Sequence, residues 1–219
     1  MALVLGSASS LAQGKPKPKG KPEEEDEVSA TEDLMREHGL LRRLLLVYGE
    51  AIRRIDARED LKPEPIAHAA EIIRAFIEDY HERDEEEYIF PRFRKAGKMV
   101  DLVGTLLAQH QAGRKLTAEI TRLATPSGLA SPTDRRKLAD SMQLFLRMYE
   151  PHAAREDTVL FPAFRELLSA KELDKLKDVF EDKEKALPGG GFEKMVVEVA
   201  SIERALGIDD LAKFTPRLT

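Results

Sequence analysis

The feature that most constrains this chain is a 14-residue segment that occurs twice, at residues 81–94 and 152–165. The two copies share a His, a Glu four residues later, a Phe-Pro pair, a second Phe and an Arg. Because four residues of α-helix turn about 400° and rise about 6 Å, the imidazole and the carboxylate of each copy lie on one helix face. Two such helices facing each other would bring two His and two carboxylates to a common point.

The repeat extends to a second pair of segments. His38, followed four residues later by Arg42, lines up with His110, followed four residues later by Arg114. Apolar residues recur at helical spacing around both His residues, and no segment alternates with a period of two over a useful length. The chain therefore predicts two copies of one helical hairpin. Packed antiparallel, they form an all-α four-helix bundle with one His from each helix inside.

We expect the first long helix to begin near Ser29 or Thr31, where a hydroxyl can cap it. The other long helices are expected near residues 66–94, 99–124 and 133–168, with Pro151 kinking the last of them or loosening one turn. Two more helices are predicted at residues 171–186 and 192–206. The predicted organisation is thus a tail at 1–30, a bundle at 31–168 and a C-terminal helical extension at 169–219.

The first 30 residues do not have the composition of a folded element. Residues 1–12 are apolar and small, too few to span a bilayer, and end in a Ser-Leu-Ala that fits a signal-peptide cleavage site. No basic region precedes this run, so a periplasmic or exported location and a cytoplasmic one both stay open. The alternating Lys/Pro run at 15–22 and the acidic run at 23–27 predict an extended linker.

Composition excludes several classes of function. The chain has no Cys, which rules out disulfides, thiolate metal sites and catalysis by Cys. Its net charge is −5 and it carries no long one-sided basic segment, which argues against nucleic acid as a partner. The 34% of charged and 42% of hydrophobic residues fit a soluble helical protein without a membrane span.

A single His on an apolar helix face is more often structural than a metal ligand. His68 has this interpretation, because it lies about 140° away from His81 around the same helix. Burying four imidazoles and two carboxylates together, in contrast, would cost several kcal/mol unless a cation neutralised them. The candidate metal ligands are therefore His38, His81, Glu85, His110, His152 and Glu156.

Imidazole and carboxylate without sulfur suit iron, manganese, zinc or copper. Six ligands exceed the number that a tetrahedral zinc ion takes, and two carboxylates between two sets of His favour a pair of metals bridged by Glu85 and Glu156. The His-rich set favours iron over manganese. A ferritin-like site needs Glu-x-x-His on two helices, and only Glu78 with His81 matches that pattern.

The motif order resembles that of the hemerythrin-like (HHE cation-binding) domains. The order is a lone His38, then His81 and Glu85 followed by Phe-Pro, then a lone His110, then His152 and Glu156 followed by Phe-Pro. The resemblance covers roughly residues 31–168. It implies a carboxylate-bridged non-heme diiron centre that binds O₂ or a related small ligand, in a carrier, a sensor or a stress-response protein.

One departure from that family matters for the chemistry. Oxygen-carrying hemerythrins have a second His four residues after the third-helix His, and Arg114 stands there instead. The resemblance then implies a more open site, which favours peroxide or nitric-oxide chemistry over reversible O₂ carriage. Further candidates for a vacant ligand position are Asp157, Glu37, Glu82, Glu86, Tyr48, Tyr80 and Tyr149. The three Glu side chains can instead be solvated or lie behind the ligands, and the three Tyr side chains can be core aromatics with a solvated hydroxyl.

We therefore expect a non-heme diiron protein that binds or reduces O₂, peroxide or NO, with electrons from an external donor if it turns over. The resemblance assigns no separate catalytic residue. The alternatives are a redox- or oxygen-sensing module that acts on the C-terminal helices, and an iron-binding module without turnover.

Overall fold

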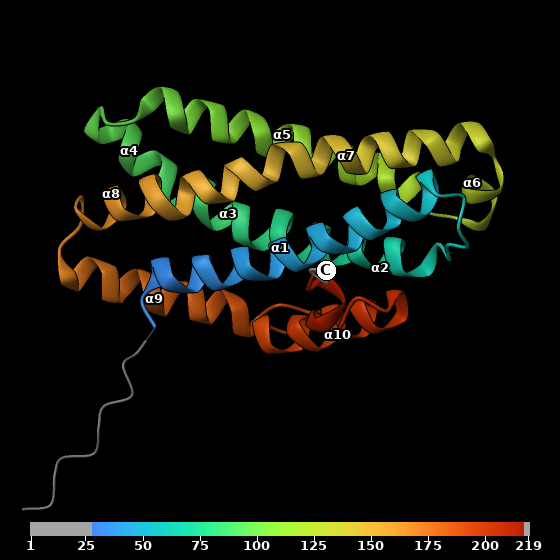
Figure 1. The fold of residues 1–219 in the computed structure, drawn as a ribbon. Coiled ribbons are helices and arrows are strands. Elements are labelled where there is room, and N and C mark those ends of the chain that lie inside the picture. Colours follow the sequence, from blue (N-terminus) through green and yellow to red (C-terminus); the bar gives the residue numbers. More distant parts are fainter. Residues whose placement is uncertain (1–27, 217–219) are drawn as a thin grey trace, which may run out of the picture.

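The computed structural model describes residues 28–216, which form helices and no strand (Figure 1). The expected all-α bundle is thereby confirmed. The signal-peptide-like run and the linker expected before residue 28 lie outside the described residues. None of the helices in residues 28–216 is both long and apolar enough to cross a membrane.

The first helix, α1 (Ala30–Asp56), begins at a fully formed capping box. Ser29 Oγ accepts the Glu32 backbone N–H, and the Glu32 carboxylate accepts the Ser29 N–H at 2.9 Å. Two donors that a helix start leaves free are thereby satisfied. The helix ends just before Arg58, whose φ of 56° is left-handed and turns the chain back.

The second and fourth long helices each contain π-helical turns. The second runs continuously through α2 (Glu64–Ile72), η1 (Ile73–His81), α3 (Glu82–Asp84), η2 (Glu85–Ile89) and α4 (Phe90–Ala96). The fourth runs through α7 (Pro132–Arg155), η3 (Glu156–Leu160) and α8 (Phe161–Arg165). The π-helical segments η2 and η3 begin at the Glu of the two repeated motifs, which is a common place for such turns in functional sites.

The Phe-Pro pairs explain η2 and η3. A proline has no N–H, and its ring collides with the carbonyl four residues earlier, so an α-turn cannot close at Pro91 or Pro162. The N–H of the preceding Phe instead bonds the carbonyl five residues back, Phe90 to Glu85 and Phe161 to Glu156. The pairs therefore shape the helices as well as pack the bundle end.

The loosened turn expected at Pro151 is not found there. Pro151 lies inside α7 with its ring exposed, and the π-helical turn follows at Glu156–Leu160. The equivalent turn at Glu85–Ile89 forms although Tyr80 occupies the position equivalent to Pro151. The loosened turn thus lies five residues after Pro151 and directly precedes the Phe161-Pro162 pair.

The third long helix, α5 (Val100–Leu123), follows a turn in which Gly97 has a φ of 64°. A short helix that the sequence did not predict, α6 (Pro126–Ala130), is capped by the Thr125 hydroxyl and joins α5 to α7. Helix α5 packs against α7 and α2, and α1 packs against α7. These four long helices run side by side in Figure 1.

Two apolar clusters fill the bundle on either side of a polar layer. In the first and third helices the chain passes from the cluster around Phe93 and Phe164, through a His, into the cluster around Phe76 and Phe145. In the second and fourth helices the order is reversed. The alternation is that of an antiparallel bundle, and it places one His of each helix at the same level.

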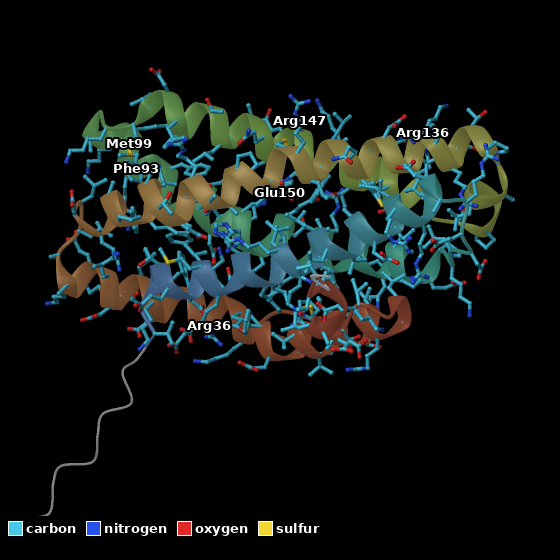
Figure 2. The ribbon with its side chains drawn as sticks, in the orientation of Figure 1. Arg36, Phe93, Met99, Arg136, Arg147 and Glu150 are labelled. Carbon is cyan, nitrogen blue, oxygen red and sulfur yellow. The ribbon has the colours of Figure 1, made fainter. Side chains whose placement is uncertain are left out.

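Two further helices, α9 (Ala170–Lys185) and α10 (Phe192–Leu206), lie along the outside of α1 (Figure 1). Figure 2 shows Arg36 on the side of α1 that faces them, where its guanidinium stacks on Phe192 and pairs with Glu193. A charge-assisted pair between Arg43 and Glu203 adds a second anchor, at 2.6 Å. A short 3-10 turn, η4 (Leu211–Phe214), follows.

Candidate metal centre

All six candidate ligands lie in the polar layer between the two apolar clusters. Each is at most 3% exposed, and their Nε2 and carboxylate atoms converge. Each helical hairpin contributes two histidines and one carboxylate. The first hairpin contributes His38, His81 and Glu85, and we call its two histidines the first-hairpin pair. The second hairpin contributes His110, His152 and Glu156, and its histidines are the second-hairpin pair.

Each carboxylate contacts one His of each pair. The Oε-to-Nε2 distances are 3.8 and 3.3 Å from Glu85 to His81 and His110, and 3.0 and 3.3 Å from Glu156 to His152 and His38. The candidate ligands form two groups, and within each group the ligand atoms lie within 4.8 Å of one another: His38, His81 and Glu85, and Glu85, His110, His152 and Glu156. A third such group contains Glu82, Glu86 and His110. Glu85 belongs to the first two groups, and the buried cluster fits a metal site.

The interior atoms of this cluster lack ordinary hydrogen-bond partners. Both carboxylate oxygens of Glu85, both of Glu156, and His110 Nε2 are buried without a hydrogen bond. Buried polar atoms in folded proteins are nearly always paired, and an unpaired carboxylate is costly. Oxygen and imidazole lone pairs gathered in this way are the ligands that a divalent or trivalent transition-metal ion takes.

The other ring nitrogen of each His faces outward to a specific acceptor. These Nδ1 contacts are His81 to Glu37 at 2.6 Å, His38 to Asp157 at 2.6 Å, His110 to Glu86 at 3.0 Å and His152 to Gln109 at 2.9 Å. We call these four residues the outer acceptors. By holding the Nδ1 proton they leave the Nε2 lone pair pointing into the cluster.

The sequence predicted part of this arrangement. Glu37 and Glu86 were expected either to fill a vacant ligand position or to lie behind the ligands, and the structure shows the second. Asp157 was considered only as a ligand and Gln109 was not considered, whereas both lie behind a His ring. A signal was present in the repeat: each outer acceptor either directly precedes a lone His or directly follows a motif Glu. Glu37 and Gln109 precede a lone His, and Glu86 and Asp157 follow a motif Glu.

Arg114 belongs to an ion-paired network on the Nδ1 side of His110. Its guanidinium lies 2.8 Å from Glu82 and 2.8 Å from Glu86. The Tyr149 hydroxyl donates to the other Glu82 oxygen at 2.6 Å. The sequence did not predict this network, because its members come from three helices.

Of the tyrosines, only Tyr149 enters this network. Its ring also lies edge-on to His152, with centroids 5.3 Å apart. The Tyr80 hydroxyl reaches the Phe180 carbonyl instead, and Tyr48 packs against Phe145 with its hydroxyl buried and unpaired.

His68 lies away from the cluster, as expected. It is half-buried on α2 and faces Glu198 of α10 at 3.5 Å.

Gly113 makes room for Tyr149. A Cβ at Gly113 would lie 2.0 Å from the Tyr149 hydroxyl oxygen, which is a steric overlap. We expect Gly113→Ala to displace the tyrosine, separate its hydroxyl from Glu82 and lower the free energy of unfolding by about 1–3 kcal/mol. Gly104 lies on the same helix with open space around it, so Gly104→Ala should instead stabilise by about 0.5–1 kcal/mol. Urea unfolding of both variants tests this, and equal effects would contradict it.

The charges of the cluster are not evenly distributed in the metal-free protein. Burial opposes a charge on His38, but its hydrogen bond to Asp157 and the nearby Glu156 carboxylate raise its pKa to about 10. Burial likewise opposes a charge on His110, but the nearby Glu85 carboxylate and the hydrogen bond to Glu86 raise its pKa to about 10. Both rings are therefore protonated on both nitrogens at neutral pH, and a metal ion that binds Nε2 must displace the Nε2 proton.

The pKa values of His81, Glu85 and Glu156 are shifted in different directions. Burial, followed by the proximity of His38, lowers the pKa of His81. Burial, followed by repulsion from Glu156, raises the pKa of Glu85 to about 8. Burial opposes the charge of Glu156, but His152 and His38 hold its pKa well below the usual value. Glu156 is therefore the anionic member of the carboxylate pair and Glu85 the protonated one.

The sequence matches the model of one protein family. The model of the hemerythrin HHE cation-binding domain matches residues 29–131 and 101–188. Relatives from Mycobacterium tuberculosis and Mycobacterium bovis, both named only as uncharacterized proteins, are 47% identical over 218 residues, covering 99% of this chain and 85% of theirs. No solved structure gives a significant match.

Proposed function

The chain belongs to the hemerythrin HHE cation-binding domain family, and we propose that it is a non-heme diiron protein that binds or reduces a small oxidant. The observation that supports this most is the inward-facing cluster of four Nε2 atoms and two carboxylates, with every Nδ1 bonded outward. Such an arrangement presents lone pairs to a cation and leaves the interior oxygens unpaired without one.

Two ions fit the ligand set better than one. Glu85 belongs to both groups of ligand atoms, and each carboxylate contacts a His of each hairpin. Six ligands without sulfur favour a pair of iron ions over a tetrahedral zinc ion. Bound iron would supply the electron exchange with O₂, peroxide or NO. The protein residues orient the imidazoles, exclude bulk water and hold protons outside the cluster.

The experiment is to load the metal-free protein with ferrous iron without oxygen and then add peroxide. We expect near-ultraviolet absorption of ferric iron to develop in the wild type and in His68→Ala, a control outside the cluster, and not in His81→Ala. Steady-state loss of peroxide in the presence of a reductant would mark an enzyme. A wild-type protein that takes up no iron, or that stays spectrally silent with each of peroxide, O₂ and NO, would contradict the proposal.

A sensing function without turnover is the second candidate, because one contact links the cluster to the C-terminal helices. Buried Asp84, on the turn between His81 and Glu85, pairs with Lys183 of α9. A shift of this turn on oxidation would reach α9 directly. A change in protease sensitivity of residues 170–206 on oxidation, without peroxide turnover, would favour sensing, and unchanged sensitivity would argue against it.

A further inference from the structure

The outer acceptors follow the internal repeat, with one exception. Glu86 and Asp157 occupy equivalent positions, and each hydrogen-bonds Nδ1 of the lone His in the other hairpin. Both are also paired with an arginine, Glu86 with Arg114 and Asp157 with Arg42. The two lone histidines therefore have the same type of outer acceptor, although His110 also has buried Glu82 nearby, where the other hairpin has Ala153.

The exception is the pair of positions 37 and 109. Both directly precede a lone His, and the side chain at each position hydrogen-bonds Nδ1 of the motif His in its own hairpin. Position 37 holds a carboxylate, 1% exposed and 2.6 Å from His81, whereas position 109 holds an amide, 2.9 Å from His152. The Nδ1 partner of His81 is thus a buried carboxyl group, whose pKa burial raises, and the partner of His152 is an amide.

The nature of the acceptor controls how strongly an imidazole donates to a metal. A carboxylate accepting the Nδ1 proton raises the basicity of Nε2 and stabilises positive charge on the ring, and an amide oxygen does so less. Changes of such outer partners typically alter metal affinity about 10–100-fold. Glu85 and Glu156 each contact one His of each pair, and both belong to the atom group of His110 and His152. The outer acceptors at positions 37 and 109 are therefore a separate difference between the two pairs.

We propose that Gln109 makes the two cation positions unequal, so that the ion held by the second-hairpin pair, His110 and His152, is bound more weakly and is lost first. This inference rests on the proposed diiron function. Gln109 is a positioning residue in this account: it contacts His152 and not the cation. The first-hairpin pair, backed by Glu37, retains its ion.

The test follows the release of ferrous iron from the loaded full-length protein to a coloured chelator, without oxygen. For the wild type we expect two phases of one iron each. Gln109→Glu should slow the fast phase about tenfold or more, and Glu37→Gln should accelerate the slow phase by a similar factor. Gln109→Ala, which removes the acceptor, should accelerate only the fast phase.

The double variant Glu37→Gln with Gln109→Glu keeps the composition and net charge of the wild type while exchanging the two acceptors. It should restore two phases of unequal rate. A single phase in the wild type, or a change in both phases by the same factor in Gln109→Glu, would overturn the role of Gln109 while leaving a diiron protein intact. Fewer than two irons in the wild type would overturn the diiron function and this inference together.

Discussion

Glu85→Gln is expected to lower the iron content from two ions per chain to at most one while leaving the metal-free protein folded. Burial and then repulsion from Glu156 raise the pKa of Glu85 to about 8, so this side chain is protonated at pH 7 when no metal is bound. An amide resembles a protonated carboxyl group in shape but cannot become a bridging anion. We therefore expect the free energy of unfolding of the metal-free protein to change by less than about 1 kcal/mol.

Glu156→Gln should behave in the opposite way in the metal-free protein. Burial disfavours the Glu156 charge, but His152 and His38 keep its pKa well below the usual value, so the side chain is ionised. Removing that charge takes away one of the two carboxylates beside the buried His38 imidazolium, which costs about 3 kcal/mol. Metal analysis and urea unfolding of both variants measure the contrast. Equal stability losses in the two metal-free variants would contradict these charge assignments.

Metal uptake should release at least two protons and should strengthen as the pH rises. His38 and His110 both have their pKa raised to about 10, by hydrogen bonds that outweigh burial, so both lose a proton when Nε2 binds a cation. The apparent affinity should rise about tenfold per pH unit for each proton displaced, between about pH 6.5 and pH 10. Calorimetric titration of ferrous iron, without oxygen and in buffers of different ionisation enthalpy, counts the protons.

The same pKa shifts fix the sign of a stability effect in the metal-free protein. A His whose pKa is raised in the folded state stabilises the fold below its unfolded pKa of about 6.5, and that contribution is lost as the pH rises towards about 10. The metal-free protein should therefore lose stability over this interval while the loaded protein changes less. Uptake without proton release, or equal pH dependence of the two forms, would contradict the assigned charges.

The ligand set could be predicted because its geometry is local. A His and a Glu four residues apart share a helix face whatever the tertiary structure, and the repeat of 81–94 at 152–165 showed that two such faces exist. The bundle followed from the same repeat, since two hairpins bury their apolar faces only against each other. The boundaries of α10 and the capping box at Ser29 were also readable from local signals.

The surroundings of the ligands could not be predicted in the same way, because they depend on contacts between helices. Asp157 lies 119 residues from His38 in sequence, and Tyr149 lies 67 residues from Glu82. Arg114 pairs with acids of the neighbouring helix, which sequence spacing does not show. The π-helical turn before Pro162 follows from a local rule, since a proline prevents the α-helical turn before it from closing. We applied this rule to Pro151 alone.

The most direct test of the account is the metal content of the full-length protein after loading with ferrous iron without oxygen and removal of free metal. We expect two irons per chain in the wild type and in His68→Ala, and a loss of at least one ion in His81→Ala and in His152→Ala. Retention of a single zinc ion in place of iron, or iron content that is the same in the wild type and in both cluster variants, would contradict a diiron centre at these residues.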